Sequence, residues 1–317
     1  MHNPISVNTK RACPLSGSHS AYVVSDKDRH GENLRNVISK ESGLIFVDPI
    51  PFENTEEFYK KEYRKSYKGI ITPKKKHIYR AGKNALSRYN RIKSTVDIGD
   101  TILDAGSSSG EFVYLLKSRG HKAKGLEANQ GYAMFGKEEL GIDVEIKAFS
   151  EFESELKFDA ITMFHVLEHL ENPISTLEHL SSFLKPDGFL IIEVPNILYP
   201  SMSFIQKWHP GHLFSYCTET LSKIADKISM EVVLCETIAG GANIFSVFKK
   251  SSIETPNQPP TKFIPENKLK LLLVQKRRYF FKVTTYLKFM LKMKKSVTEW
   301  SKTKSKSPKT ILDEIYK

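Results

Sequence analysis

Cysteine is scarce in this sequence, and long apolar runs are missing from it. The 317 residues include only three cysteines, Cys13, Cys217 and Cys235, and their spacing forms no pairs. Such usage argues against a disulfide framework and fits a reducing compartment. No run of about 18 apolar residues occurs, so we expect no membrane-spanning segment. The first residues also lack the apolar stretch of a signal peptide, and we therefore expect a cytoplasmic protein.

Acidic residues are sparse in one part of the chain. Residues 262–317 contain 16 Lys and Arg against 4 Asp and Glu, whereas the first 261 residues contain 32 of each kind. The tail therefore carries the whole net charge of +12. A charge asymmetry of this kind concerns binding partners rather than the fold.

One stretch predicts a nucleotide-binding turn. Thr101-Ile-Leu-Asp-Ala-Gly-Ser-Ser-Ser-Gly110 reads as a buried strand that enters a turn of small residues, and residues 111–119 then read as a helix. The free N–H groups and the positive dipole end of that helix would face a ligand above the turn. Strand, turn and helix in this order begin a doubly wound α/β sheet.

An acid at the end of the next strand supports this interpretation. Glu127 follows the short strand 123–127, and it lies 23 residues beyond Asp104. An acidic side chain at roughly 20 residues is where doubly wound folds hydrogen-bond a ribose diol. The alternative is a Glu that merely faces solvent at the end of a strand.

Two later blocks carry a family resemblance. Residues 158–170, Phe-Asp-Ala-Ile-Thr-Met-Phe-His-Val-Leu-Glu-His-Leu, form a strand that runs into a polar loop, and residues 184–196 form a turn that feeds another buried strand. Together with the Leu-Asp-Ala-Gly turn, these blocks closely resemble the class I S-adenosylmethionine-dependent methyltransferases over residues 101–250. One departure is Ser108, which stands where that family usually has the middle glycine of its turn.

The resemblance implies a fold and an order of segments. We expect an α/β protein with a doubly wound, seven-stranded, Rossmann-like methyltransferase sheet, whose last two strands form a hairpin around Gly240 and Gly241. The expected strands lie near 101–105, 123–127, 144–148, 158–164, 188–194, 230–237 and 244–249. The expected segments are a small N-terminal module (1–60), a helical lead-in (61–98), the methyltransferase domain (99–250), a linker (251–265) and a basic amphipathic helical tail (266–317).

The resemblance also implies a cofactor, S-adenosyl-L-methionine, and the residues that bind it. It assigns the methionine end to the first turn, the ribose to Glu127 and the adenosine to Ala128. Phe149 and Ser150 would flank the adenine, although the acid usual in that region is missing. Phe164 and His165 would touch the methionine moiety or the methyl acceptor. The positions expected in the first turn are Asp104, Ala105, Gly106, Ser108 and Gly110.

Histidines are the candidates for acid–base chemistry. His209 and His212 lie in a loop after the fifth strand, where an imidazole could take a proton from an acceptor hydroxyl near neutral pH. They could equally tie that loop to the sheet. His165 begins a His-x-x-Glu-His run that looks like a metal motif. In the family these letters mark a strand end and a loop, so we expect no metal there.

The N-terminal module resembles a zinc ribbon that has lost its ligands. In related enzymes two Cys-x-x-Cys-Gly knuckles hold the metal, but here only Cys13 is present, and Ser16, Ser39 and Ser42 occupy the other positions. A hydroxyl cannot replace the thiolates of structural zinc. We therefore expect a metal-free module. The alternative is that two Ser-Gly turns resemble the knuckles of a ribbon by chance.

Three classes of function remain open. The resemblance favours methylation of a sugar or another small hydroxylated metabolite, including surface-polysaccharide precursors. A nucleic-acid methyltransferase with a basic binding tail is the second class, but the chain lacks the acceptor loop of base-amino methylation. The third is a non-catalytic binding protein with a methyltransferase fold.

The tail carries an apolar stripe among its basic residues, with Leu273, Phe280 and Leu287 at heptad spacing. This pattern predicts a helix that docks at the inner face of an anionic membrane or against a protein.

Overall fold

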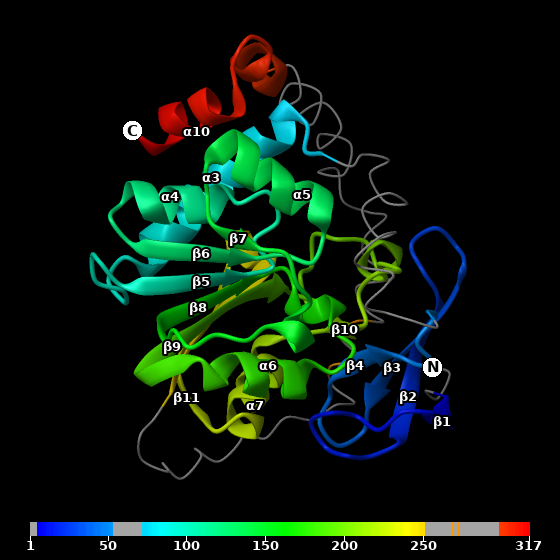
Figure 1. The fold of residues 1–317 in the computed structure, drawn as a ribbon. Helices are drawn as coiled ribbons and strands as arrows, with labels where there is room; N and C mark the ends of the chain where they lie inside the picture. Colours follow the sequence, from blue (N-terminus) through cyan, green and yellow to red (C-terminus); the bar gives the residue numbers. More distant parts are fainter. Residues whose placement is uncertain (1–4, 53–71, 251–267, 269–271, 273–297) are drawn as a thin grey trace. The chain divides into compact units, whose positions relative to one another are not determined.

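The computed structural model describes residues 5–52, 72–250, 268, 272 and 298–317 (Figure 1). The linker, the apolar stripe of the tail and residues 61–71 of the lead-in lie outside these ranges. The chain divides into two compact units, each assembled from separate segments. The first unit consists of residues 1–53, 164–182 and 186–281, and the second of residues 54–163, 183–185 and 282–317.

A seven-stranded mixed sheet has the order β11-β12-β9-β8-β5-β6-β7, which confirms the predicted fold class. Strand β5 pairs in parallel with β6 and with β8, whereas β12 pairs antiparallel with both β11 and β9. The predicted hairpin is therefore present. The bounds are β5 (Thr101–Ala105), β6 (Lys122–Leu126), β7 (Val144–Glu145), β8 (Phe158–Phe164), β9 (Leu184–Pro195), β11 (Met230–Ile238) and β12 (Asn243–Lys250).

Most of these strands lie where periodicity and apolar runs place them. Strand β9 begins at Leu184 rather than near residue 188, and β7 is shorter than expected. It ends at Glu145 rather than near residue 148. The backbone N–H of Ala148 donates to the Glu151 carboxylate (3.1 Å), and the chain turns into the short helix η3 (Phe149–Glu151). A local side-chain bond of this kind competes with strand pairing, and it ends the strand early.

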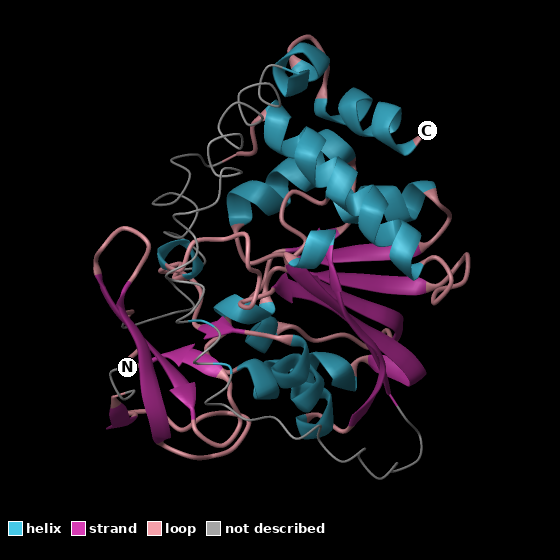
Figure 2. Ribbon diagram, turned by 180° about the vertical axis from the view of Figure 1, so that it is seen from behind, coloured by secondary structure: helices cyan, strands magenta, loops and turns pink. Residues whose placement is uncertain are grey.

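Helices of the second unit gather on one side of β5 and β6 (Figures 1 and 2). They include α10, which our sequence interpretation does not single out within the tail. Ser307 caps this helix by accepting the N–H of Thr310, and Pro308 occupies its first turn. A Ser-Pro start is a helix signal that was available in the sequence. The bounds are α3 (Lys75–Ile92), α4 (Glu111–Ser118), α5 (Gln130–Phe135), η2 (Gly136–Leu140) and α10 (Pro308–Tyr316).

The tail is thus partly a packing element. The Arg80 guanidinium on α3 makes an ion pair with Glu299, whose side chain is buried, and the Tyr316 hydroxyl of α10 donates to the backbone carbonyl of Glu111 (2.8 Å). Ile311 and Leu312 are also buried. Within residues 298–317, Ile311, Leu312 and Tyr316 pack on the protein body, whereas Trp300 is exposed.

The first unit contains a second, five-stranded sheet in the order β1-β2-β3-β4-β10 (Figure 2). Its last strand comes from residues far along the chain, so the N-terminal module does not form its sheet from residues 1–60 alone. Trp208 and Phe204, just before β10, pack with Ile38 and Ile45 of this sheet. The bounds are β1 (Ser6–Asn8), β2 (Ser20–Lys27), β3 (Asn33–Ser39), β4 (Ile45–Val47) and β10 (Phe214–Ser215), with helices α6 (Pro173–Ser182) and α7 (Thr218–Lys227).

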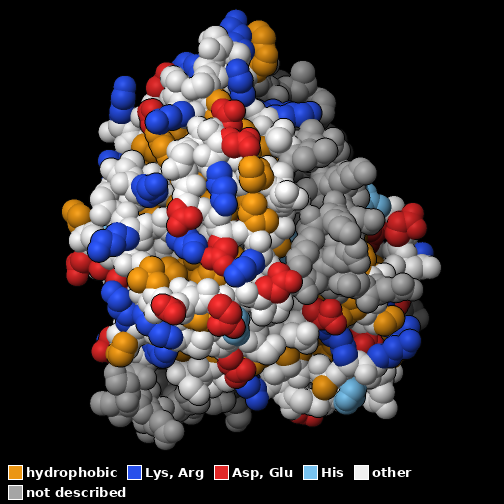
Figure 3. All heavy atoms as spheres, viewed as in Figure 1, with side chains coloured by type: hydrophobic (Ala, Val, Ile, Leu, Met, Phe, Trp, Pro, Cys, Tyr) orange, Lys and Arg blue, Asp and Glu red, His pale blue; other side chains and the backbone are white. Residues whose placement is uncertain are grey.

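The face drawn in Figure 3 intermingles basic and acidic side chains, as the equal charge count of the first 261 residues predicts. Among the described residues, no helix is long and apolar enough to cross a membrane.

Candidate functional site

The turn after β5 has a backbone that glycine favours. Gly106, Ser108 and Gly110 all have positive φ angles, of 82°, 54° and 84°. At Gly110 a Cβ atom would stand only 1.8 Å from the Ile142 side chain, so no other residue fits there without rearrangement. Gly110 is also the N-cap of α4, which places the start of the helix directly beside the turn.

Glu127 joins this turn to the end of β6. One of its carboxylate oxygens accepts the N–H of Ser108 (2.8 Å), and the other accepts the N–H of Asn129 (2.9 Å). The side chain is therefore held at the turn by two backbone groups. A carboxylate oxygen can accept more than one hydrogen bond, so the same oxygens can also receive ribose hydroxyls.

Asp104 lies at the base of the same turn as a buried acid. Its carboxylate accepts the Thr162 hydroxyl (2.7 Å). Burial raises the pKa of Asp104 to about 6, because Thr162 and the charge of Arg88 only partly offset the loss of hydration. A buried carboxylate of this kind suits a cationic ligand, and S-adenosylmethionine carries both an ammonium and a sulfonium group. The residues present therefore fit the expected cofactor.

The other expected cofactor positions divide between the units. Ala105 ends β5 and is fully buried, Ala128 is half-buried after β6, and Phe149 and Ser150 lie in η3. These belong to the second unit with the turn. Phe164, at the end of β8, belongs to the first unit with all the candidate histidines.

His165 is held between two acids of the first unit. Its Nε2 atom lies 3.1 Å from the Glu193 carboxylate, and its Nδ1 atom lies 3.4 Å from that of Glu168. The Asn243 side chain donates to the same Glu193 oxygen (2.5 Å). The imidazole is 36% exposed, and its residue has a φ of 57° in the left-handed region.

These acids set the protonation of His165. Burial lowers the pKa of His165, but the hydrogen bonds and charges of Glu168 and Glu193 outweigh that effect and raise it to about 9. The free protein therefore holds His165 as an imidazolium at neutral pH. Neither Glu193 nor Asn243 is among the residues expected from sequence. The only available signal was the charged Glu193 inside an apolar strand.

His209 and His212 lie in a different environment. Their rings stack at 4.3 Å, and the His209 Nδ1 atom accepts the N–H of Gly211 (2.9 Å). Burial, with further contributions from nearby cationic groups, lowers the pKa of His209 to about 3 and that of His212 well below its ordinary value. Both rings are neutral at physiological pH and are weak proton acceptors.

The four knuckle positions of the N-terminal module come together in two pairs. The thiol of Cys13 lies 3.1 Å from the Ser42 hydroxyl, and the Ser16 hydroxyl lies 3.4 Å from that of Ser39. Side-chain hydrogen bonds therefore link the positions at which a ribbon would hold its metal. The metal-free module remains a prediction.

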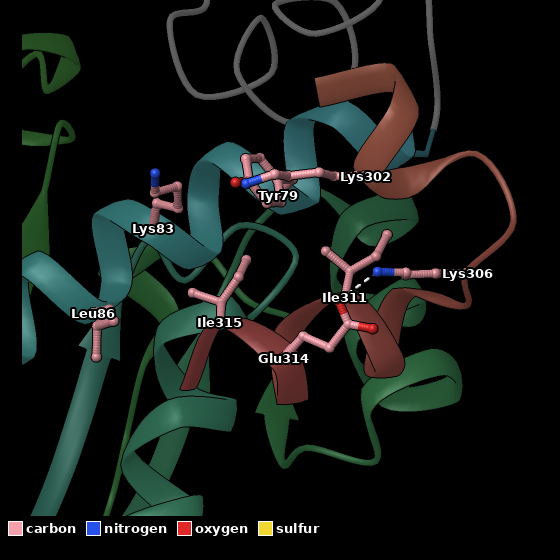
Figure 4. Close-up of a pocket in the computed structure, with 8 residues that line it drawn as sticks. All are labelled: Tyr79, Lys83, Leu86, Lys302, Lys306, Ile311, Glu314 and Ile315. Atoms are coloured by element: carbon pink, nitrogen blue, oxygen red, sulfur yellow. Dashed lines mark hydrogen bonds and ion pairs between the residues drawn. The ribbon is translucent and has the colours of Figure 1, made fainter. Parts of the chain in front are cut away.

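A separate surface pocket of about 330 Å³ lies between α3 and the end of the tail (Figure 4). Lys302 lies over the Tyr79 ring of α3, with its ammonium 5.9 Å from the ring centroid, and Lys306 pairs with Glu314. The pocket contains none of the expected site residues.

Comparison with known proteins supports the family. A family described as a methyltransferase domain matches residues 60–233, more than half of the chain. No curated protein matches the sequence. Many solved structures do, and one is the magnesium protoporphyrin IX methyltransferase of Synechocystis PCC 6803 with bound SAH. It is 12% identical, with 62% of this chain and 98% of that chain covered and a TM-score of 0.49.

Two other solved structures show the same level of similarity. A TehB-like SAM-dependent methyltransferase from Corynebacterium glutamicum ATCC 13032 is 17% identical, with coverages of 54% and 99% and a TM-score of 0.41. A Haloferax volcanii methyltransferase in complex with the Trm112 activator is 13% identical, with coverages of 56% and 96% and a TM-score of 0.46. We transfer no acceptor and no site residue from these proteins. The family match identifies the chain as a member of the methyltransferase-domain family and, as the resemblance predicts, as an S-adenosylmethionine-dependent enzyme.

Proposed function

We propose that the enzyme methylates a hydroxyl group of a sugar or another small hydroxylated metabolite, such as a surface-polysaccharide precursor. The observation that supports this proposal is the environment of His165, a partly exposed imidazole between Glu168 and Glu193. A hydroxyl is a poor nucleophile, and its methylation needs a group that removes its proton.

The cofactor, when bound, supplies an activated methyl group, so the protein mainly binds, aligns and excludes water. In this proposal Glu127 holds the ribose and the turn from Asp104 to Gly110 holds the methionine end. Ala128, Phe149 and Ser150 line the adenosine, and Phe164 borders the methionine moiety. These are the roles that the family resemblance assigns to these positions.

We assign the acceptor proton to His165 rather than to His209 or His212. Glu193 and Glu168 raise the proton affinity of His165, whereas burial makes the other two rings weak acceptors. His165 must first lose its own proton, because its pKa of about 9 keeps it charged at neutral pH. Glu193, held by Asn243, orients the ring through Nε2 and stabilises the imidazolium that forms when the acceptor proton arrives at Nδ1, where the acceptor hydroxyl takes the place of the longer Glu168 contact (3.4 Å).

The pH dependence of the methyl transfer rate tests this assignment. For the chelator-treated, metal-free enzyme we expect kcat/KM to rise with pH until the pKa of His165, near 9, is passed. Glu193→Gln removes a charge that favours the imidazolium, so the rise should shift to lower pH. His165→Gln should lower kcat by about 10²–10⁴-fold with little effect on cofactor affinity.

Candidate acceptors can be screened by measuring the release of S-adenosylhomocysteine (SAH), the product left after methyl transfer. Nucleotide sugars, amines and oligonucleotides are tested in parallel. His179→Asn, on α6, is the matched histidine control and should behave like the wild-type protein. Transfer to oligonucleotides alone, or a pH profile unaffected by Glu193→Gln, would overturn the proposal. Cofactor binding without transfer to any acceptor would support the non-catalytic alternative.

We also propose that the tail between residues 266 and 297 docks the enzyme on an anionic membrane surface. This proposal is based on the sequence, where an apolar stripe alternates with many Lys and Arg. A protein partner on the same stripe is the alternative. A membrane site would suit a lipid-linked or surface-glycan acceptor.

A further inference from the structure

A cluster of metal-ligand side chains lies where η4 (Leu167–His169) meets the loop before β10. Glu168, His169 and His212 each present one ligand atom, and these three atoms lie within 4.8 Å of one another. All three residues belong to the first unit. We propose that they bind a divalent transition-metal ion, with Zn²⁺ as the best match, in a site separate from the cofactor turn.

The tautomer of His169 supports this proposal. Its Nδ1 atom lies 2.6 Å from the carbonyl oxygen of Gly211, and a carbonyl can only accept, so Nδ1 carries the proton. In the neutral ring Nε2 is then an acceptor, and it lies 3.9 Å from the Glu168 carboxylate. Two acceptors that face each other need a proton or a cation between them. Donation of the second ring nitrogen to a carbonyl is also the usual arrangement of a metal-bound histidine.

The carboxylate of Glu168 gives an independent indication. The residue is only 2% exposed, and its Oε2 atom is buried without a hydrogen-bond partner among the described residues. Its other oxygen faces His165 and His169. A buried carboxylate oxygen without a partner is costly, and a bound cation would remove that cost.

His212 is prepared to act as the third ligand. It packs edge-on against His169, with ring centroids 4.9 Å apart, and it stacks on His209. Gly211 orients two of these rings, because its carbonyl accepts from His169 and its N–H donates to His209.

The ligand set indicates the class of ion. Two imidazole nitrogens and one carboxylate, with a fourth position left for water or another ligand, are typical of Zn²⁺ and of similar first-row ions. Metal–nitrogen distances of about 2.1 Å would require the three atoms to approach within roughly 3.5 Å of one another. Small rotations of side chains achieve this. This proposal departs from our expectation that the His-x-x-Glu-His run binds no metal, and it adds His212 as a ligand that the run itself does not contain.

Cobalt titration of the full-length, chelator-treated protein tests the proposal. We expect one Co²⁺ per chain with visible absorption bands of a four- or five-coordinate site, and displacement of Co²⁺ by Zn²⁺. Glu168→Gln and His212→Gln should each weaken binding by about 100-fold or more. Zinc should raise the melting temperature of the wild-type protein and not that of these variants, and their melting curves show whether they fold.

Two controls separate this site from other sources of metal. His179→Asn removes a histidine outside the cluster, and Cys13→Ser removes the one thiol at the knuckle positions of the N-terminal module. Both should bind Co²⁺ as the wild-type protein does. Loss of binding in Cys13→Ser, with a thiolate charge-transfer band in the wild-type spectrum, would place the metal in the module and overturn the proposal. Absence of stoichiometric binding to the wild-type protein would also overturn it and would leave a proton between His169 and Glu168.

Discussion

Ser108 has a left-handed backbone conformation that is unfavourable for a residue with a side chain. Its φ of 54° costs a residue with a side chain about 1–2 kcal/mol. The same conformation points its N–H at the Glu127 carboxylate (2.8 Å). The residue that departs from the family glycine thus keeps the backbone that a glycine would adopt, and it contributes to the placement of Glu127.

The first prediction concerns Glu127. Replacing it with Ala removes the acceptors proposed for the ribose hydroxyls, each worth about 1.5–3 kcal/mol when the acceptor is charged. We expect Glu127→Ala to weaken S-adenosylmethionine binding at least tenfold in calorimetry, with the circular dichroism of the wild-type protein. Glu139→Ala, an exposed acid on η2, is the control. An unchanged cofactor affinity would show that Glu127 does not hold the ribose.

Asp104 allows a prediction about pH and stability. Its folded pKa of about 6 lies above the ordinary 3.8, so the folded state binds the proton more tightly than the unfolded state. The carboxylate therefore destabilises the fold progressively as pH rises from about 4 to about 6, and fully above that. The Asp104→Asn variant lacks this carboxylate. The difference in unfolding free energy between the variant and the wild-type protein should therefore increase, in favour of the variant, by about 2 kcal/mol as the pH rises from about 4 to about 8.

Urea denaturation at the two pH values measures this difference, and calorimetry should show that the same variant binds the cofactor poorly. A difference that does not change with pH would mean that the Asp104 carboxyl is hydrated in the folded protein.

Local and distant contacts differ in how far sequence predicts them. The turn from Asp104 to Gly110 and the acid Glu127 were predictable, because each depends on residues close in sequence or at a regular strand spacing. The partners of His165 were not, since Glu193 and Asn243 come from strands 28 and 78 residues away. The third proposed metal ligand was missed for the same reason, because His212 reaches Glu168 through the fold rather than through a motif.

At the scale of elements, α10 is the main addition that the structure makes. Its residues were assigned to a basic amphipathic tail, yet Leu312 and Ile311 are buried and Tyr316 bonds to the end of α4. Gly82 on α3 allows this approach, because a Cβ there would stand 2.6 Å from the Leu312 side chain. Charge counting does not detect three apolar positions spread over a short helix.

The docking of α10 predicts a clear difference between its two faces. Leu312→Ala removes a fully buried side chain and should lower the free energy of unfolding by about 2–5 kcal/mol. Lys309→Ala, on the exposed face, should change it by no more than about 0.5 kcal/mol. Chemical denaturation of the two variants makes the comparison. Equal stabilities would indicate that α10 is detached from α3 in solution.

At the scale of the whole molecule, the charge asymmetry bears on location. Removing the entire tail is a poor test of membrane docking, because it would also remove α10 and destabilise the second unit. Replacing Arg277, Arg278, Lys282 and Lys288 with Gln keeps α10 and removes cations worth about 1 kcal/mol each near an anionic surface. We expect the full-length protein to sediment with anionic vesicles at low salt and this variant to remain in the supernatant.

Neutral vesicles provide the control for that experiment, and neither protein should sediment with them. If the wild-type protein stays in the supernatant with both kinds of vesicle, the segment between residues 266 and 297 is an assembly or packing element and does not bind membranes.

The contact between Tyr316 and Glu111 also has a consequence for synthesis. The two residues are 205 positions apart, so a ribosome that adds about 5–20 residues per second makes α10 roughly 10–40 seconds after α4. During that interval the apolar surface of α3 and α4 that α10 covers is exposed on the nascent chain. The second unit can therefore complete its fold only after α10 has been made, and until then it presents a binding surface for chaperones.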